Sequence, residues 1–368
     1  MKIRIEQKQL ADAAKRAHRR LPTNPPAPIM GGLILDAADT GAVTLSGFDY
    51  ETSTRSTLDG TVLEPGVVVV SGRMLADVTA ALPAGPVDLV GDEYHLEVST
   101  PGNQFQLPVM ARNDYPALPE APAASGTVDG AGFAAAVVHA ASVSMPQKDA
   151  VGRFEAFGGV SVAAVDGTLW VRASDSYRMV QYALPWADAD GGLLIPAPDL
   201  AATAKALDGG QVTIGFPTAG NAVASLSNAA MTVTSRCIAA DFPDITRLFP
   251  KKDDAAGKAT FDAAELVAAV KRAALVNESD VKPVQVAFDG QGATVSGGSG
   301  GPSGRTRVDA EQDGLNGFAI YYRPGYLASV IAPVEGAVDM WFSTPTKPAL
   351  VEPADGGTYR AVLMPVRV

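Results

Sequence analysis

The chain has 368 residues, of which 47% are apolar and 19% are charged, and its formal net charge is −11. A chain of this length needs two or three hydrophobic cores, and its composition excludes a disordered or fibrous protein. The acidic total argues against a protein that coats nucleic acid by bulk attraction, although basic residues can still gather on one inner face.

The first third of the chain predicts a strand, a helix and then a series of strands. Residues 2–5 alternate apolar and polar side chains, and the apolar period becomes helical over residues 7–21. A proline-rich turn at 22–28 follows. After it, the predicted elements are strands at 32–35, 43–48, 52–58 and 67–70, a helix at 73–82, and strands at 87–90, 95–99 and 104–109.

The middle third repeats this order. It begins with a predicted helix at 132–144, whose apolar face carries His139. A lone histidine in such a place predicts a hydrogen-bonded core residue and not a ligand. The remaining predicted elements are strands at 159–165, 169–174 and 179–184, a helix at 198–207, and strands at 212–216, 222–226 and 232–237.

The last third repeats the order again. Helices are predicted at 262–276 and 324–331, with strands around 284–288 and from the second helix to the C-terminus. Residues 251–258 form a charged connection, and the Gly/Ser-rich stretch at 296–304 predicts a flexible hairpin loop. Each third is therefore an antiparallel sheet with segregated helices, which is an α+β pattern.

A phrase of Asp, aromatic and Pro residues marks the same period. It occurs as Asp114-Tyr115-Pro116 and, 127 residues later, as Asp241-Phe242-Pro243. A further 127 residues reach the end of the chain at Val368. Such internal periodicity predicts three tandem copies of one domain. The predicted domains are 1–119, 120–250 and 251–368.

Motifs for catalysis and metal binding are weak. Residues 297–301 match the Gly-x-Ser-x-Gly pattern of serine hydrolases, but Ser299 lies in a Gly/Ser-rich stretch and all three histidines precede it. Asp188 and Asp190 could be paired acids, although a polar turn explains them more simply. The histidines lack metal-ligand spacing, and no phosphate-binding loop is present. The sequence predicts no enzyme, metal or cofactor, with a hydrolase using Ser299 as a remote alternative.

Two further features bear on where the chain works. No run of about 20 apolar residues and no N-terminal apolar segment with a cleavage site is evident, so neither membrane insertion nor secretion is predicted. The single cysteine, Cys237, excludes an internal disulfide framework, and its strand-like surroundings predict a small buried side chain. We expect a cytoplasmic protein.

Three ordered motifs carry a family resemblance. They are Ala-Ser-Asp-Ser-Tyr-Arg-Met at 173–179, Phe-Pro-Asp-Ile-Thr-Arg-Leu-Phe-Pro at 242–250, and the tail Val-Leu-Met-Pro-Val-Arg-Val at 362–368. With the length and the threefold repeat, they resemble the bacterial DNA sliding clamp family, the beta subunit of DNA polymerase III. The resemblance implies three clamp domains per chain and a head-to-tail homodimer that forms a ring around duplex DNA.

The resemblance implies that basic residues line the hole of this ring. A ring holds DNA by topology, so a few phosphate contacts without base readout are enough. The first helix has basic residues opposite its apolar stripe, although an ordinary solvated helix face would also carry them. The residues expected to face DNA are Lys8, Lys15, Arg19, Arg20, Asn24, Arg73, Gln147, Lys148, Arg153 and Lys205.

The resemblance also implies a groove for short peptides, broadly Gln-x-x-Leu-Phe, from the clamp loader, from replicative and repair polymerases and from other clamp-motif proteins. A methionine in such a wall can repack around different partners. From the residues alone, the tail could equally be a simple closing strand. The residues expected at the groove are Phe157, Ser174, Ser176, Tyr177, Arg178, Met179, Pro243, Arg247, Leu248, Tyr326, Thr346, Pro348, Val362, Met364, Pro365, Val366 and Arg367.

The implied dimer interface pairs the first domain of one copy with the third domain of the other. The resemblance implies that Phe105 and Leu107 meet Leu275 and Val276, and these apolar residues have no evident role within one chain. The contact joins two different surfaces and closes on itself, as a ring requires.

Some positions depart from the family pattern. Asn24 stands where an arginine is common, and the predicted helix at 198–207 lacks the usual basic start. Ser176, Thr346 and Pro348 alter the expected groove. These departures leave open a divergent second clamp with altered binding of partners or inhibitors.

Overall fold

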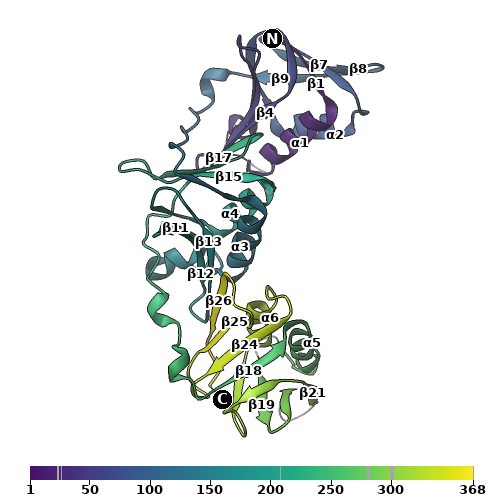
Figure 1. The fold of residues 1–368 in the computed structure, drawn as a ribbon. Helices are drawn as coiled ribbons and strands as arrows, with labels where there is room; N and C mark the ends of the chain where they lie inside the picture. Colours follow the sequence, from purple (N-terminus) through teal and green to yellow (C-terminus); the bar gives the residue numbers. More distant parts are fainter. Residues whose placement is uncertain (23–24, 26, 208, 280–281, 299–301, 368) are drawn as a thin grey trace. The chain divides into compact units, whose positions relative to one another are not determined.

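The structure is a computed structural model that describes residues 1–22, 25, 27–207, 209–279, 282–298 and 302–367. Within these residues one order of elements occurs three times: a strand, a helix, four or five strands, a second helix and three strands (Figure 1). The strands of the three named sheets pair antiparallel, so the α+β prediction is confirmed. The described residues divide into two compact units, unit 1 (1–131 and 203–237) and unit 2 (132–202 and 238–368).

The first repeat provides most of unit 1. Its elements are β1 (Lys2–Glu6), α1 (Gln7–His18), β2 (Gly32–Ala37), β3 (Val43–Phe48), β4 (Thr52–Leu58), β5 (Gly60–Glu64), β6 (Gly66–Ser71), α2 (Gly72–Ala81), β7 (Pro86–Gly91), β8 (His95–Thr100) and β9 (Asn103–Met110).

The other two repeats follow the same order. The middle repeat contains β10 (Gly126–Asp129), α3 (Gly130–Val143), β11 (Gly159–Val165), β12 (Thr168–Ser174), β13 (Arg178–Pro185), β14 (Gly191–Pro196), α4 (Ala197–Ala206), β15 (Gln211–Gly215), β16 (Val223–Ser227) and β17 (Met231–Arg236). The last contains β18 (Gly257–Asp262), α5 (Ala263–Ala274), β19 (Val284–Asp289), β20 (Gly292–Gly297), β21 (Gly304–Val308), β22 (Glu311–Asp313), β23 (Ala319–Tyr322), α6 (Pro324–Ile331), β24 (Ala337–Phe342), β25 (Ala349–Pro353) and β26 (Tyr359–Leu363).

Unit 1 is built on one sheet, in the order β10-β15-β16-β17-β4-β3-β2-β6-β9-β8-β7-β1-β5. Helices α1 and α2 lie side by side next to this sheet (Figure 1). The buried face of α1 consists of Leu10 and three alanines, whose small side chains allow close packing. The helix was expected to run to Leu21 but ends at His18. Pro22 lies just beyond, and a residue before proline avoids the helical conformation.

Tyr115 anchors the end of the first repeat. Its ring is buried with Ile34, Phe48 and Val69. Its hydroxyl accepts a hydrogen bond from the Phe48 amide at 2.9 Å and donates one to the Gly32 carbonyl at 3.2 Å. Burial raises the pKa of Tyr115 to about 12, so the hydroxyl remains a donor at neutral pH. The first Asp-aromatic-Pro phrase is therefore an anchor as well as a connector.

A Tyr115→Phe substitution is expected to destabilise this corner by about 1–3 kcal/mol, because the buried Phe48 amide loses its acceptor. Hydrogen–deuterium exchange at the Phe48 amide should accelerate at least tenfold. Tyr94→Phe is the matched control, since Tyr94 is an exposed tyrosine of the same unit. Equal exchange in the two variants would contradict the anchoring role.

Unit 2 joins the middle and last repeats through their strands. Its larger sheet has the order β14-β11-β12-β13-β26-β25-β24-β18-β22, and β21-β20-β19-β23 form a second sheet. The pairing of β13 with β26 places Met179 opposite Val362 and Arg178 opposite Leu363. The tail of the chain therefore starts beside the loop between β12 and β13.

Some expectations fail or lie outside the described residues. Strands β5, β10, β14 and β18 are missing from the sequence prediction, and each of them begins at glycine. Cys237 is half-exposed just after β17, not buried. Ser299 lies outside the described residues, and Asp188 and Asp190 are exposed between β13 and β14.

No group of three or more His, Cys, Asp or Glu side chains in the described part of the chain is arranged to hold a metal ion. Among its helices, none has the length and apolar character needed to span a membrane.

Candidate functional site

The loop between β12 and β13 presents an aromatic side chain to solvent. One carboxylate oxygen of Asp175 accepts hydrogen bonds from the amides of Tyr177 (3.0 Å) and Arg178 (2.9 Å). Ser176 adopts a positive φ of 73°, and its amide donates to the buried Ser174 hydroxyl at 3.1 Å. These bonds fix a tight turn that leaves Tyr177 51% exposed.

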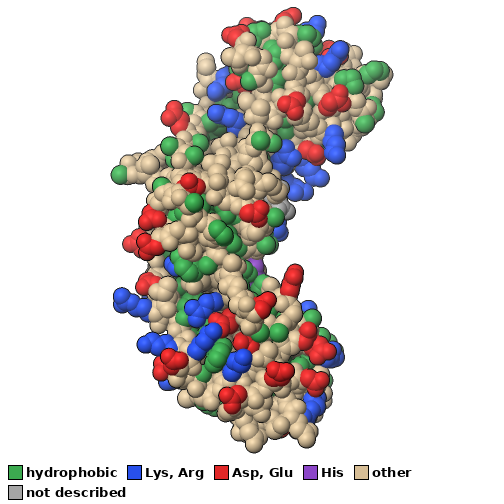
Figure 2. Space-filling model, in the orientation of Figure 1, with side chains coloured by type: hydrophobic (Ala, Val, Ile, Leu, Met, Phe, Trp, Pro, Cys, Tyr) green, Lys and Arg blue, Asp and Glu red, His purple; other side chains and the backbone are tan. Residues whose placement is uncertain are grey.

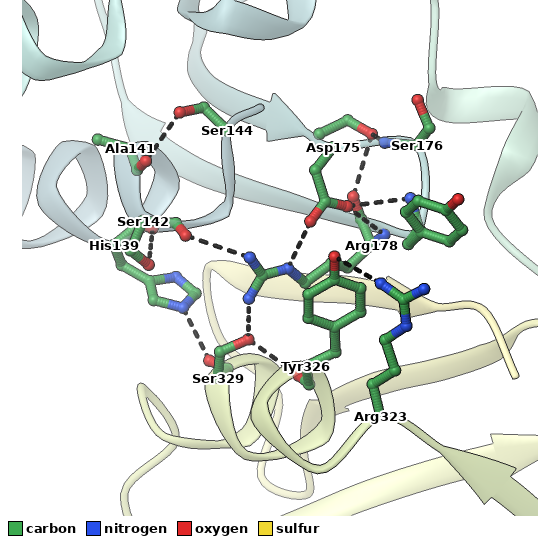
Figure 3. Close-up of polar contacts among 12 residues, drawn as sticks. His139, Ala141, Ser142, Ser144, Asp175, Ser176, Arg178, Arg323, Tyr326 and Ser329 are labelled. Atoms are coloured by element: carbon green, nitrogen blue, oxygen red, sulfur yellow. Dashed lines mark hydrogen bonds and ion pairs between the residues drawn. The ribbon is translucent and has the colours of Figure 1, made fainter. Parts of the chain in front are cut away.

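Arg178 connects this turn to two helices (Figure 3). Its Nε lies 2.9 Å from Asp175 in an ion pair whose side chains are only 11% and 8% exposed. Its other nitrogens donate to the Ser329 hydroxyl on α6 and to the Ser142 carbonyl on α3, the latter at 3.3 Å. The guanidinium also lies 4.4 Å from the centre of the Tyr326 ring. Arg178 is therefore a structural centre of the site.

His139 adds a second polar link between α3 and α6. Its Nε2 lies 2.9 Å from the Ser329 carbonyl, and its Nδ1 lies 2.8 Å from the Tyr182 hydroxyl. A carbonyl only accepts hydrogen bonds, so Nε2 carries the proton and Nδ1 accepts from Tyr182. Burial lowers the pKa of His139, and the nearby Arg178 charge lowers it further, against the Ser329 hydrogen bond, which raises it. The prediction of a hydrogen-bonded histidine is confirmed.

This lowered pKa makes unit 2 sensitive to acid. The unfolded chain binds a proton at His139 near pH 6.5, whereas the folded chain binds it only at lower pH. Stability is therefore lost as the pH falls below about 6.5 toward the folded pKa. Urea unfolding monitored by tryptophan fluorescence should show a steeper loss between pH 7.5 and 5.5 for the parent chain than for His139→Gln. Parallel losses would contradict this assignment.

The tail runs past the exposed turn. The Met364 amide donates to the Tyr177 carbonyl, and the Val366 amide donates to the Tyr321 carbonyl, both at 2.8 Å. Met364 keeps 39% of its surface exposed, next to Tyr177. Val362 was expected as an apolar wall but is completely buried in the sheet between Met179 and Leu350, so it presents no surface to a ligand.

The connection from 241 to 256 carries the second Asp-aromatic-Pro phrase. Phe242 packs edge-on against Phe157, with their ring centres 6.1 Å apart. Ile245 is buried, whereas Leu248 is 57% exposed in a short 3-10 helix (Thr246–Leu248). The Thr246 hydroxyl and amide donate to Asp244, and these hydrogen bonds lower the pKa of its carboxyl. The connection therefore presents Leu248 on a locally fixed turn.

Side chains of the larger sheet fix this connection through ion pairs and ring contacts. Arg360 lies 5.2 Å from the centre of the Phe249 ring and 3.4 Å from the Glu352 carboxylate. Lys252 forms an ion pair with the same carboxylate and lies 5.2 Å from the Trp341 ring centre. Sequence reasoning missed these contacts because each joins residues that are distant in sequence and carry no local motif.

The expected groove residues are thus only partly assembled by direct contacts. Hydrogen bonds or ring contacts join Ser174, Ser176, Tyr177, Arg178 and Tyr326, and the strand pairing brings Met179 and the tail beside them. Phe157 contacts the connection. The remaining expected residues lie on the connection, on the tail or in the turn between β24 and β25, and are Pro243, Arg247, Leu248, Thr346, Pro348, Pro365, Val366 and Arg367.

The expected DNA-facing residues have mixed surroundings. Lys8 and Lys15 on α1 and Arg19 at its C-terminal cap are exposed opposite the buried stripe, and Figure 2 shows Lys and Arg side chains gathered at the place of α1. Arg20 donates to the Thr203 hydroxyl at 2.6 Å, and the Gln147 amide donates to the Gly158 carbonyl. The rest are exposed or lie outside the described residues: Arg73, Lys148, Arg153 and Lys205 are exposed, and Asn24 is not described.

The residues expected at a dimer interface also differ in exposure. Leu275 is 82% exposed and Phe105 is 39% exposed, whereas Val276 is intermediate. Leu107 is 3% exposed in the core of unit 1, so the expectation that it lacks a role within the chain is wrong. Phe105 lies on β9, whose residues 103–108 pair only with β8 among the described strands.

Comparisons with known proteins match both ends of the chain to one family. The model for the N-terminal domain of the DNA polymerase III beta subunit matches residues 1–119, and the model for the C-terminal domain matches 246–367. A beta sliding clamp of Streptomyces coelicolor is 34% identical over the full length of both chains. The beta sliding clamp homolog GriR of Streptomyces muensis is 31% identical, covering 89% of this chain and 87% of its own.

A solved structure shows the same fold. The sliding clamp of Pseudomonas aeruginosa bound to griselimycin superimposes with a TM-score of 0.91, covering 100% of both chains at 20% identity.

Proposed function

Because this chain belongs to the beta sliding clamp family of bacterial DNA polymerase III, we propose that two copies close head to tail into a ring around duplex DNA. In this proposal the domains are 1–119, 120–250 and 251–368. The ring works in the cytoplasm and holds DNA without reading its sequence. It performs no catalysis. It tethers polymerases, the clamp loader and repair proteins by their short motifs.

The observation that carries the docking function is the assembly around Arg178. A buried ion pair, two helices and the tail fix the exposed Tyr177 and Met364 side by side. Exposed apolar side chains on a rigid frame are what a short peptide needs for its own apolar residues. We propose that these two residues, with Tyr326 and the exposed Leu248, are the principal walls of the groove.

The basic residues on α1 support the DNA-binding function. Lys8, Lys15 and Arg19 are exposed on the side of the helix opposite its core-facing stripe. A side chain that contacts phosphate only needs charge and reach, and such contacts weaken as salt rises. This basic set is small, so we propose that topology, and not affinity, retains the ring on DNA.

The function is tested by two measurements on the full chain. Light scattering at micromolar concentration should give the mass of a dimer. After loading by a clamp loader, that dimer should be retained on nicked circular DNA and should slide off linear DNA with free ends. A labelled Gln-x-x-Leu-Phe peptide should bind with saturation. A stable monomer that neither loads onto DNA nor binds the peptide would refute the proposal.

The alternative function is that of a divergent second clamp, and the 31% identity to the GriR homolog supports this alternative. Such a protein would keep the ring while changing which peptides or inhibitors it accepts. If the chain forms a loaded dimer but binds Gln-x-x-Leu-Phe at least a hundredfold more weakly than a housekeeping clamp measured beside it, this alternative is supported. The remote hydrolase alternative would need an activity that Ser299→Ala abolishes.

A further inference from the structure

A second arginine of unit 2 lies beside the proposed groove without an acidic partner. Arg323, between β23 and α6, is half-exposed. Its guanidinium lies 5.0 Å from the centre of the Tyr177 ring and 5.3 Å from that of Tyr326. It donates one long hydrogen bond, of 3.4 Å, to the Tyr326 hydroxyl. Among the described residues it forms no ion pair.

Arg178 makes the contrast informative (Figure 3). The Tyr326 ring lies between the two guanidinium groups. Arg178 is buried, paired with Asp175 and bonded to Ser329 and Ser142. Arg323 has the same charge and the same aromatic neighbour, but most of its donors have no partner within the described part of the chain. One arginine therefore builds the site, and the other has donors left for a ligand.

We propose that Arg323 reads a carboxylate on the docked peptide, so that unit 2 prefers peptides with an acidic group close to their apolar anchor. This inference rests on the proposed docking function. A guanidinium stacked on aromatic rings keeps its planar fork oriented, and that fork matches the two oxygens of a carboxylate. The guanidinium lies over the Tyr177 ring and donates to the Tyr326 hydroxyl, and these contacts prepare Arg323 for such a pair before a peptide arrives.

The position of Arg323 fits the apolar part of the groove. Tyr177 contacts Arg323 on one side and is hydrogen-bonded through its carbonyl to the amide of the exposed Met364. A peptide whose leucine or aromatic residue covers Tyr177 and Met364 brings its neighbouring residues within reach of Arg323. The chain as a whole carries a net charge of −11, so its long-range field does not attract an acidic peptide. The preference must therefore arise locally.

The test uses fluorescence anisotropy with a labelled parent peptide, Ala-Gln-Asn-Asn-Leu-Phe-Asn, blocked at both ends. In three further peptides each asparagine is replaced in turn by aspartate, and a fourth has a free C-terminal carboxylate. We expect at least one acidic peptide to bind about tenfold more tightly than the parent, as a charge-assisted hydrogen bond supports. The position that gains affinity distinguishes a side-chain carboxylate from a terminal one.

Two substitutions and a control assign the effect to Arg323. With Arg323→Gln the tenfold preference should disappear, so that acidic and parent peptides bind about equally. With Arg323→Lys the preference should be intermediate, because an ammonium keeps the charge but lacks the planar fork. Arg236→Gln removes the same charge from unit 1 and should keep the full preference. The preference should also shrink as salt rises from 50 to 500 mM, as expected of a partly exposed pair.

The outcomes separate this inference from the function on which it rests. If all five peptides bind the parent chain equally, or if Arg323→Gln keeps the preference, the carboxylate-reading role is overturned while peptide docking stands. If no peptide binds the parent chain, the docking function itself fails.

Discussion

Replacing Arg178 with methionine is expected to destabilise unit 2 by about 3 kcal/mol and to weaken peptide binding more than tenfold. The substitution leaves the carboxylate of Asp175 buried without its cation, and breaking a buried pair in this way costs about 3–5 kcal/mol. It also removes the donors that bond α3 and α6 to the turn. Tyr177 then loses the frame that fixes it beside the tail.

Urea unfolding by tryptophan fluorescence measures this loss, since Trp170, Trp186 and Trp341 all lie in unit 2. The matched control is Arg307→Met. Arg307 pairs with Asp289 at 3.1 Å within unit 2, but both side chains are about half exposed, so water screens the pair and little stability should be lost. Peptide binding is measured at a temperature where the variant is still folded. A variant with parental stability and affinity would refute the central role of Arg178.

Replacing Leu275 with aspartate is expected to convert the proposed dimer into monomers at micromolar concentration. Leu275 follows α5 and is 82% exposed, which is unusual for a leucine unless another surface covers it. An unpaired carboxylate at a closed apolar interface weakens association by about a hundredfold or more, because it must lose its water without gaining a partner. DNA loading is lost with the ring.

Leu63→Asp is the control for this substitution, because Leu63 is an exposed leucine on the edge strand β5 that the proposed interface does not include. Light scattering should give a dimer for Leu63→Asp and a monomer for Leu275→Asp. The same monomer result is expected for Phe105→Asp. If Leu275→Asp remains a dimer, the subunits must meet elsewhere.

The sequence predicted the repeat well because each repeat has its own local signals. The apolar periods of α1, α3 and α5 and the proline at the start of α6 are visible without any tertiary information. At the start of α5, Asp262 is the cap, accepting a hydrogen bond from the Glu265 amide at 2.8 Å, and not the first helical residue. The helix limits therefore differ by a few residues, and the order of helices α1 to α6 is as predicted, although the strands that precede α3 and α5 were missed.

The site was less accessible to sequence reasoning. The motif at 173–179 pointed to Asp175, Tyr177 and Arg178, but nothing local indicated that Arg178 would be buried against Ser329, 151 residues away. Leu107 and Val362 were misjudged for a related reason. In a strand an apolar residue can face the core or a partner surface, and a one-residue change of register exchanges the two faces. Only the pairing of the strands decides between them.

The pairing of β13 with β26 also has a kinetic consequence. Arg178 and Leu363 are direct partners although 185 residues separate them in the chain. Closing so large a loop consumes entropy before any contact compensates for it, so pairings of this kind form late in folding. We expect the sheet of β11 to β14 to form first. The edge of β13 then remains unpaired until β26 pairs with it. During that interval the edge is the part of the chain most exposed to wrong pairing with another copy.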